Sequence, residues 1–316
     1  MMTRYMFMVI ASLLASVLAA AAEPEFKVYQ VARAKEGPKI DGILEDPCWN
    51  NIARISGFTQ VITGSGPAKE QTSVAMVSDD KALYMRIECA DADVAAKVKE
   101  HDGAVYTDDC IEIFIEPKNI HKSAHHFVVN ALSVQYEEDP EQGKDWNGLW
   151  ETSAKKGENG WSAEVMIPFA SLGTAAKEGD IWGFNVCREN YVSGNERYTE
   201  LSCWSDTGGG FNAPERFGHI VFGSYLACLK DNLLPEMAKR RQDIESFMKE
   251  HPKAAADCKP RYEQVVKSIQ EISDAVKAKD IITEKEFSEL YPKSEATLRT
   301  LDGLIYELRL AALLLE

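Results

Sequence analysis

The stretch Tyr106-Thr107-Asp108-Asp109-Cys110-Ile111-Glu112-Ile113-Phe114-Ile115-Glu116-Pro117 decides the fold. Isoleucine occupies every second position from 111 to 115, which is the pattern of a strand with one buried face. The opposite face carries Glu112 beside Phe114, and Tyr106 stands at the entry of the strand. Carboxylates accept hydrogen bonds from sugar hydroxyls and flat rings stack on sugars, so one interpretation is a carbohydrate platform. The other interpretation is an ordinary solvated strand face.

The first residues have the features of an export signal. Arg4 precedes an apolar run from Tyr5 to Ala22 that ends in three alanines. A positive start, a short apolar core and small residues at the end predict a secretory signal peptide over residues 1–22. We therefore expect cleavage near Ala22 and an extracellular or periplasmic protein. The remaining chain divides by composition into residues 23–225 and residues 226–316.

The charge of the chain excludes some partners. It has 35 basic and 50 acidic residues, a formal net charge of -15, and the acidic excess lies mainly before Leu226. Such a surface repels phosphate backbones, so no nucleic-acid partner is expected, whereas neutral sugars and divalent cations suit it. The seven cysteines show no zinc-type spacing, and Cys187 and Cys203 are the pair that might face each other across a hairpin.

Residues 23–225 read as short strands separated by turn residues. Many short strands at this spacing predict a mainly β fold, an antiparallel β-sandwich of the jelly-roll or immunoglobulin-like kind. The predicted strands are Phe26–Val31, Thr72–Ser78, Ala82–Cys89, Cys110–Glu116, His126–Leu132, Leu149–Lys155, Trp161–Ile167, Ile181–Glu189, Arg197–Trp204 and His219–Phe222.

Residues 226–316 predict an α-helical extension, arranged as a hairpin or bundle. Apolar residues recur at helical spacing over Asn232–Glu250, Pro260–Lys279 and Thr283–Leu315. Thr283 and Glu286 form a capping box at the start of the third helix. We expect breaks before Pro252 and Pro260, and Pro292 to kink or divide the last helix. The end of that helix is apolar on more than one face, so it packs in a bundle, on the sandwich or against a protein partner.

Several segments, in order, resemble the family 9 carbohydrate-binding modules, a β-sandwich family related to DOMON-like domains. The resemblance extends over roughly 190 residues, with segments from Ile40 to Ile220, and leaves the helical extension outside. Its segments are Ile40-Asp41-Gly42 with Trp49, Ser78–Tyr84, Cys89-Ala90-Asp91, Asp109–Ile115, Gly160–Phe169, Trp182–Arg188, Trp204-Ser205-Asp206 and Pro214–Ile220.

The resemblance implies a binding site made of two rings and an acid. In sugar-binding members two aromatic rings hold a terminal sugar and an acid on the intervening strand binds its hydroxyls. The matching positions are Tyr106, Phe211 and Glu112. Those members carry an arginine where this chain has Val128, which puts the orientation of the sugar, or the site itself, in doubt. Arg188 and Asn130 are further ligand-binding candidates, although Arg188 could equally pair with a nearby acid.

Family members also bind calcium, so the resemblance makes a calcium cofactor an expectation. The matching acidic turns contain Asp79, Asp91 and Asp109. Oxygen ligands at turns suit calcium. The alternative is that these are ordinary solvated turn carboxylates.

Three functions are compatible with these observations. The leading hypothesis is an exported, non-catalytic protein that binds an oligo- or polysaccharide. The second is a glycoside hydrolase, or an accessory part of a carbohydrate-degrading system, which requires two carboxyls in one cleft; Glu112 and Glu164 are examples of such acids. The third is a structural scaffold with a degenerate sugar site, whose helices recruit a protein partner, and exposed leucines on the last helix would favour it.

Overall fold

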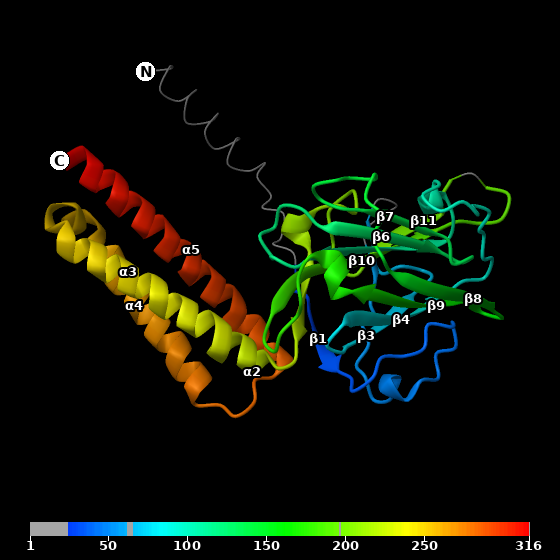
Figure 1. Cartoon of the computed structure of the whole chain (residues 1–316), viewed down its shortest axis with the longest axis horizontal. Helices are drawn as coiled ribbons and strands as arrows, with labels where there is room; N and C mark the ends of the chain where they lie inside the picture. The colour runs from blue at the N-terminus through cyan, green and yellow to red at the C-terminus, as the bar shows by residue number, and fades with distance from the viewer. Residues whose placement is uncertain (1–24, 62–65, 196, 316) are drawn as a thin grey trace, which may run out of the picture.

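A β-sandwich and a three-helix bundle lie side by side in the computed structural model of this chain (Figure 1). The structure describes residues 25–61, 66–195 and 197–315, so the signal peptide expected over residues 1–22 lies outside the described residues. Among these residues, no helix combines the length and the apolar character that crossing a membrane would require.

The strands form one continuous path of hydrogen-bonded neighbours, in the order β7-β6-β5-β10-β12-β1-β3-β4-β9-β8, with β11 beside β10 and β2 beside β11. Their bounds are β1 Val28–Arg33, β2 Thr59–Gln60, β3 Thr72–Ser78, β4 Ala82–Ala90, β5 Cys110–Glu116, β6 His125–Asn130, β7 Gln135–Glu138, β8 Glu151–Gly157, β9 Gly160–Pro168, β10 Ile181–Asn190, β11 Glu200–Cys203 and β12 Gly218–Phe222. The predicted β-sandwich is confirmed.

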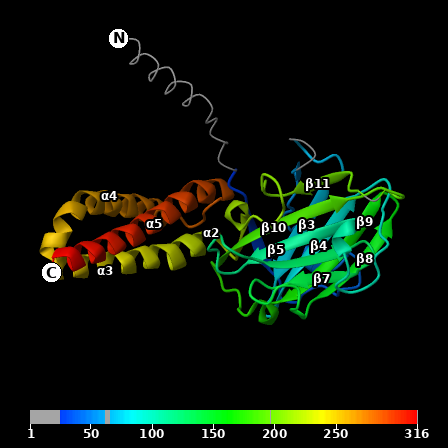
Figure 2. The ribbon, with the colours of Figure 1, turned by 90° about the horizontal axis from the view of Figure 1, so that it is seen from above.

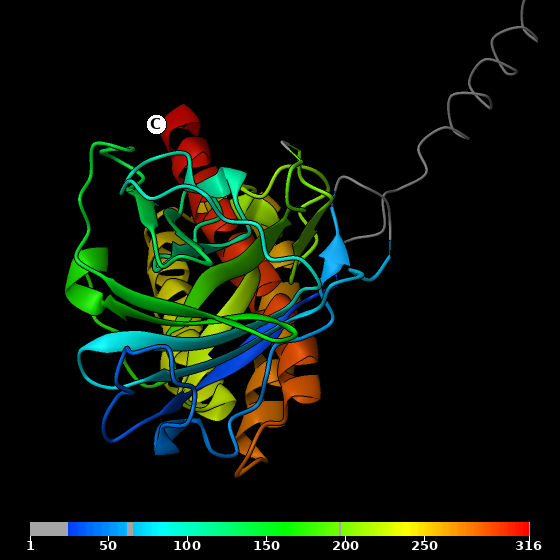
Figure 3. The ribbon, with the colours of Figure 1, turned by 90° about the vertical axis from the view of Figure 1, so that its right-hand side faces the viewer.

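Strand β1 joins the two layers of the sandwich. Val28–Val31 pairs with β12, and Ala32–Arg33 pairs with β3. We call the strands from β7 to β12, with β11 and β2, the first sheet, and β3, β4, β9 and β8 the second sheet; Figure 3 shows the two layers edge-on. Both pairings of β1 are parallel, whereas the other ladders are antiparallel. The sequence pattern predicts a strand over Phe26–Val31 but does not predict that it joins the two sheets.

Apolar side chains fill the space between the sheets. Ile111, Ile113 and Ile115 of β5 are fully buried in this core, as their alternation predicts. Phe184 and Val186 of β10 lie in the same cluster. Residues between these positions therefore face outward from the first sheet, and this outward face carries the candidate site.

The helices follow β12 directly. A helical segment runs through α2 (Tyr225–Ala227) and the π-helical η5 (Cys228–Leu233) into α3 (Leu234–Glu250), and α4 (Pro252–Lys277) and α5 (Glu284–Leu315) complete the bundle (Figure 2). The break before Pro252 is confirmed. The break before Pro260 is wrong: Pro260 lies inside α4, whose buried residues continue on both sides of it. Likewise, α5 continues through Pro292 without dividing.

The base of the bundle covers one end of the first sheet. Val28 of β1 and Val221 of β12 share a buried cluster with Tyr225 and with Phe287 of α5. At the same junction the ring of His219 lies 5.0 Å from the ring of Phe26 and 5.3 Å from that of Tyr291, centroid to centroid. The helices therefore occupy the β1/β12 part of this face and leave the β7–β5 part to other side chains.

Candidate functional site

The outward face of β5 brings an acid and a ring together. Glu112 and Phe114 alternate with the core isoleucines, and both are buried, Glu112 to 6 % exposure. Cys187 and Asn185 of β10 are their partners across one ladder, while Val128 and His126 of β6 are their partners across the other. The floor of the site therefore comes from three adjacent strands.

His126 lies at the centre of this floor. Its ring stacks on Phe114 with centroids 4.3 Å apart and planes 6° apart, and its Nε2 lies 2.7 Å from Oε2 of Glu112. Its Nδ1 is 3.9 Å from Oε2 of Glu138 on β7. Burial lowers the pKa of His126, but the hydrogen bonds to these two carboxylates outweigh it and raise the pKa to about 9. The imidazole is therefore a cation at neutral pH, flanked by two acids.

Tyr106 and Phe211 lie on the same outward face, one on each side of this floor. Tyr106 is on the short η2 (Val105–Thr107), is 43 % exposed, and meets Tyr136 of β7 edge-on at 6.0 Å between centroids. Tyr136 in turn meets the ring of His126 at 6.0 Å. Phe211 packs on the other side, against a buried cluster that contains Phe114. Aromatic rings from separate segments thus lie along this face, with Glu112 among them.

A second carboxyl lies next to Glu112. Glu189 of β10 faces the same side, and burial together with the neighbouring Glu112 raises its pKa to about 8. The hydroxyl of Tyr191 donates to Oε2 of Glu189 at 3.0 Å. Two neighbouring carboxyls cannot both be ionised at little cost, so this arrangement favours the protonated form of Glu189.

Arg188 does not belong to this face. It continues the inward positions of β10, is 1 % exposed, and its Nη2 lies 2.7 Å from Oδ2 of Asp91. Its Nη1 donates to the carbonyls of Ala90 and Glu70 at 2.7 and 3.3 Å. Of the two roles left open for Arg188, the structure shows the ion pair, because a charge on this inward position needs a buried partner.

The side chain of Asn130 is also hydrogen-bonded inside the protein. It is fully buried at the end of β6, where its Nδ2 donates to Oδ2 of Asp108 at 2.9 Å. Its Oδ1 accepts from the amides of Leu132 and Val134, at 3.0 and 2.9 Å. Its donors and acceptors are already paired inside the protein, so Asn130 would have to give up an internal hydrogen bond to bind a sugar.

The three aspartates proposed for calcium do not come together. Asp79 precedes β4 and accepts from the amides of Lys81 and Ala82, whereas Asp91 follows the far end of the same strand. Asp109 accepts from the amides of Tyr191 (2.7 Å) and Ala95, and burial raises its pKa to about 7. Among the described residues, none of the three belongs to a group whose ligand atoms lie within 4.8 Å of one another.

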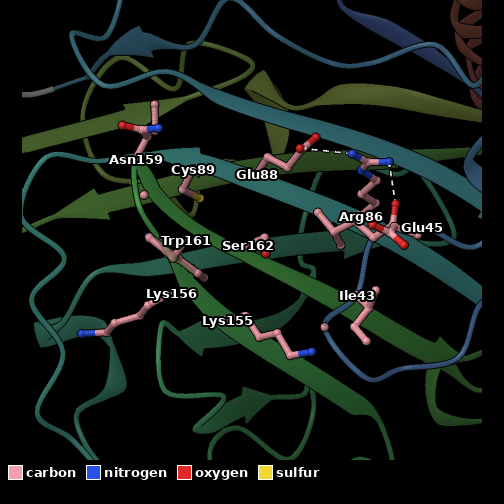
Figure 4. Close-up of a pocket in the computed structure, with 15 residues that line it drawn as sticks. Ile43, Glu45, Arg86, Glu88, Cys89, Lys155, Lys156, Asn159, Trp161 and Ser162 are labelled. Atoms are coloured by element: carbon pink, nitrogen blue, oxygen red, sulfur yellow. Dashed lines mark hydrogen bonds and ion pairs between the residues drawn. The ribbon is translucent and has the colours of Figure 1, made fainter.

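A groove of about 590 Å³ lies on the outward side of the second sheet (Figure 4). Two of its charged residues pair with each other: Arg86 lies 3.1 Å from Glu88 and also donates to the carbonyl of Leu44 at 2.9 Å. The aromatic residue among its lining residues is Trp161, which is only 3 % exposed. A ring this deeply buried offers no face for a sugar, so the groove lacks what the first sheet provides.

Sequence analysis missed part of the site. The sequence pattern did not identify His126 as a donor to sugar, nor Tyr136, Glu138 and Glu189 as part of the site. The strand β7 that carries Tyr136 and Glu138 has four residues, Gln-Tyr-Glu-Glu, with no apolar alternation. The signal for His126 was its even spacing from Val128 on one strand, which puts both on the face opposite Phe127.

Comparison with known proteins agrees with this architecture. The family model described as "Carbohydrate family 9 binding domain-like" matches residues 40–224. A family 9 carbohydrate-binding module from Caldicellulosiruptor kristjanssonii, solved in complex with glucose, is 22 % identical with a TM-score of 0.50, over 62 % of this chain and 95 % of that one. The same module with cellotriose gives 22 % identity, 62 % and 94 % coverage, and a TM-score of 0.49.

A candidate carbohydrate-binding protein from Bacteroides uniformis is 17 % identical, with a TM-score of 0.50 over 62 % of this chain and 99 % of that one. No curated protein matches the sequence. The two likenesses with a TM-score of 0.50 show a shared fold, and the family model covers more than half of the residues. The chain therefore belongs to the carbohydrate family 9 binding domain-like family, with a three-helix bundle added after its sandwich.

Proposed function

We propose that this chain is an exported, non-catalytic carbohydrate-binding protein that holds a sugar over the outward face of the first sheet. The observation that carries the proposal is that Phe211, far along the chain from Tyr106 and Glu112, lies on the same face with them around a charged floor. Rings on both sides supply stacking surface, and the carboxylate accepts hydroxyl hydrogen bonds. The glucose complex of the Caldicellulosiruptor kristjanssonii module makes a glucose-containing sugar the first ligand to test.

His126 supplies the donor that Val128 cannot. Val128 is fully buried in a small cluster with Val105 and Cys110, so the position of the family's arginine is filled by packing. His126 stands two residues earlier on the same face and is held as a cation beside Glu112. A sugar hydroxyl can then accept from the imidazolium and donate to the carboxylate at the same time. In this proposal the pair His126–Glu112 orients the sugar.

The carboxyls of the site are arranged for binding rather than hydrolysis. Glu112 and Glu164, the acids considered for hydrolysis, face outward from different sheets of the sandwich, and Glu164 accepts from Trp49 Nε1 at 3.2 Å. Glycosidases need two carboxyls in one cleft, about 5–10 Å apart. Glu112 and Glu164 therefore do not form such a pair.

Calorimetric titration of the mature protein with glucose and cello-oligosaccharides tests the site. Phe211→Ala and Tyr106→Ala each should cost about 1–3 kcal/mol of binding free energy, because each removes a stacking surface. Tyr306→Ala is the matched control, since this ring on α5 is 70 % exposed and far from the face. Equal affinities in all three variants would place the ligand elsewhere and refute the proposal.

Export is part of this proposal and rests on the sequence of residues 1–22. N-terminal sequencing of protein recovered outside the cytoplasm should return a residue close to Glu23. Recovery of a chain that begins at Met1 would instead indicate that the apolar run is retained.

The scaffold function keeps one specific observation in its favour. Leu313 and Leu314 at the end of α5 are 74 % and 77 % exposed, and Leu310 one turn earlier is 47 % exposed. Adjacent exposed leucines on a helix are typical of an interaction surface. If the bundle recruits a protein, Leu313→Glu should abolish that interaction while sugar binding stays unchanged, a result that a pull-down followed by titration would show.

A further inference from the structure

A histidine and two acids meet where the chain crosses the free edge of the first sheet. His101 and Asp102 lie in the segment that leads to Tyr106, and Glu137 lies on β7, the last strand of the sheet. One ligand atom from each lies within 4.8 Å of the others. Nδ1 of His101 is 2.9 Å from Oδ2 of Asp102, and its Nε2 is 3.6 Å from Oε2 of Glu137.

Glu137 is a buried carboxylate with an unused oxygen. The residue has 0 % exposure, and its Oε2 accepts from Nε1 of Trp150 at 2.8 Å. Its Oε1 has no hydrogen-bond partner among the described residues. An unpaired buried carboxylate oxygen costs free energy, and a cation at this point would remove the cost.

The backbone holds the two exposed residues close to that carboxylate. Asp102 has φ +59°, a left-handed conformation that is uncommon for a residue other than glycine. Its amide donates to the carbonyl of Gln135 on β7 at 3.0 Å, which ties the segment to the edge strand. Trp150 meanwhile orients the carboxylate of Glu137 from behind, as supporting residues do in metal sites.

The donor set selects the kind of ion. One imidazole nitrogen and two carboxylate oxygens suit a divalent transition metal, whereas calcium prefers six to eight oxygens. Around a tetrahedral zinc ion, ligand atoms at 2.0–2.2 Å stand about 3.4 Å from one another. One imidazole binds one ion through a single nitrogen, so in the metal-bound state His101 gives up its contact with one of the two carboxylates. The three ligand atoms, which lie within 4.8 Å of one another, reach the zinc spacing by side-chain rotation.

We propose that His101, Asp102 and Glu137 form a binding site for a divalent transition-metal ion, with zinc as the best fit. The ion would fasten the segment that carries Tyr106 to β7, whose Tyr136 already contacts the Tyr106 ring. This site is separate from the three aspartates considered for calcium. The proposed carbohydrate function is not needed for it.

Calorimetric titration of the full mature chain, freed of metal with a chelator, tests the site with ZnCl₂, MnCl₂ and CaCl₂. We expect one equivalent of Zn²⁺ to bind and to raise the unfolding temperature. His101→Ala and Glu137→Gln should each weaken Zn²⁺ binding at least tenfold. His101→Ala alters an exposed side chain, so it remains informative if Glu137→Gln fails to fold. His251→Ala, in the bundle, is the matched control and should bind normally.

Three results would overturn the metal site: no saturable Zn²⁺ binding, binding unchanged in His101→Ala, or tighter binding of Ca²⁺ than of Zn²⁺. A further titration with glucose, with and without Zn²⁺, rests on the proposed function. We expect a several-fold gain in sugar affinity with Zn²⁺ that His101→Ala loses. Zn²⁺ binding without this gain would refute the link to Tyr106, and absence of sugar binding under all conditions would refute the proposed function while the metal site stands.

Discussion

Glu112 and Glu164 occupy equivalent places on the two sheets and have different surroundings. Both point outward from a central strand, and both are buried, to 6 % and 0 % exposure. Glu164 is sealed by the segment that follows β1: Oε1 accepts from Trp49 Nε1 at 3.2 Å, and Oε2 accepts from the amides of Gly42 and Asp41 at 3.0 and 3.2 Å. Glu112 is held by side chains alone, the imidazole of His126 and the carboxyl of Glu189.

This difference separates a structural acid from a binding acid. Backbone amides fixed by a covering segment cannot move aside for a ligand without unfolding that segment. Side chains can change rotamer and exchange one hydrogen bond for another at little cost. Burial alone therefore does not identify a binding residue. Whether its hydrogen-bond partners are backbone amides or movable side chains does.

The largest expected effect belongs to Arg188, which sits next to Glu189 in sequence but faces the core. Arg188→Ala leaves Asp91 buried without its counter-charge and should lower the free energy of unfolding by about 3–5 kcal/mol. Arg33→Ala, which breaks an exposed pair with Asp80, should cost less than about 1 kcal/mol. Urea unfolding of both variants measures the contrast. A stable Arg188→Ala protein with weakened sugar binding would return Arg188 to the ligand set.

The same substitution at the two glutamates tests the comparison directly. In Glu164→Gln an amide NH₂ replaces an oxygen that faces donors, so we expect a loss of about 2–3 kcal/mol in unfolding free energy. In Glu112→Gln the imidazolium of His126 loses one carboxylate but keeps Glu138, while Glu189 loses the like charge beside it. Because these effects oppose each other, stability should change by less than about 1 kcal/mol. Sugar affinity should fall only in Glu112→Gln. The reverse pattern would show that the second sheet carries the site.

The sequence predicted the sandwich, the direction of Glu112 and the positions of the main strands along the chain, because alternation on long strands specifies which side chains are buried. The same alternation, counted from Phe184 and Val186, puts Arg188 inward. What it could not supply was the partner, since Asp91 comes from a loop almost a hundred residues away. Long-range pairing is decided by the folded chain and not by local pattern.

Two other features of the structure differ from what the sequence pattern predicts. Proline predicts a helix end because it lacks an amide hydrogen, yet Pro260 lies inside α4. There, apolar burial from Ala255 and Cys258 to Val265 against the bundle offsets one lost backbone bond. The candidate metal ligands also escaped notice, because His101 and Glu137 stand apart in sequence and meet only where the segment before Tyr106 crosses β7.

Alkaline pH should destabilise the outward face of the first sheet, which carries Glu112, and not that of the second sheet, which carries Glu164. With its pKa raised to about 9, His126 contributes stability that is complete below its ordinary value of 6.5 and lost as pH rises through 9. Glu189, with its pKa raised to about 8, favours the protonated acid, so its contribution is likewise lost as pH rises through 8. We expect a fall of roughly 2 kcal/mol in unfolding free energy between pH 7 and 9.

Urea unfolding at the two pH values measures this fall, and the variant His126→Gln should show a smaller one. Glucose affinity measured over the same range should fall as well, because the imidazolium donor is lost. An equal pH dependence in His126→Gln would assign the titration to groups outside the face.

The smallest expected effect is at the capping box of α5, which lies on neither face. The amide and hydroxyl of Thr283 donate to Oε2 of Glu286 at 2.9 and 2.8 Å, and Oγ1 of Thr283 accepts from the amide of Glu286 at 3.3 Å. Thr283→Ala removes the side-chain part of this cap and should cost about 1 kcal/mol of stability. Sugar affinity should stay unchanged, because the cap touches the bundle alone. A loss of affinity in Thr283→Ala would mean that the helices act on the binding face through the β1/β12 junction, and the face could then no longer be treated as a property of the sandwich by itself.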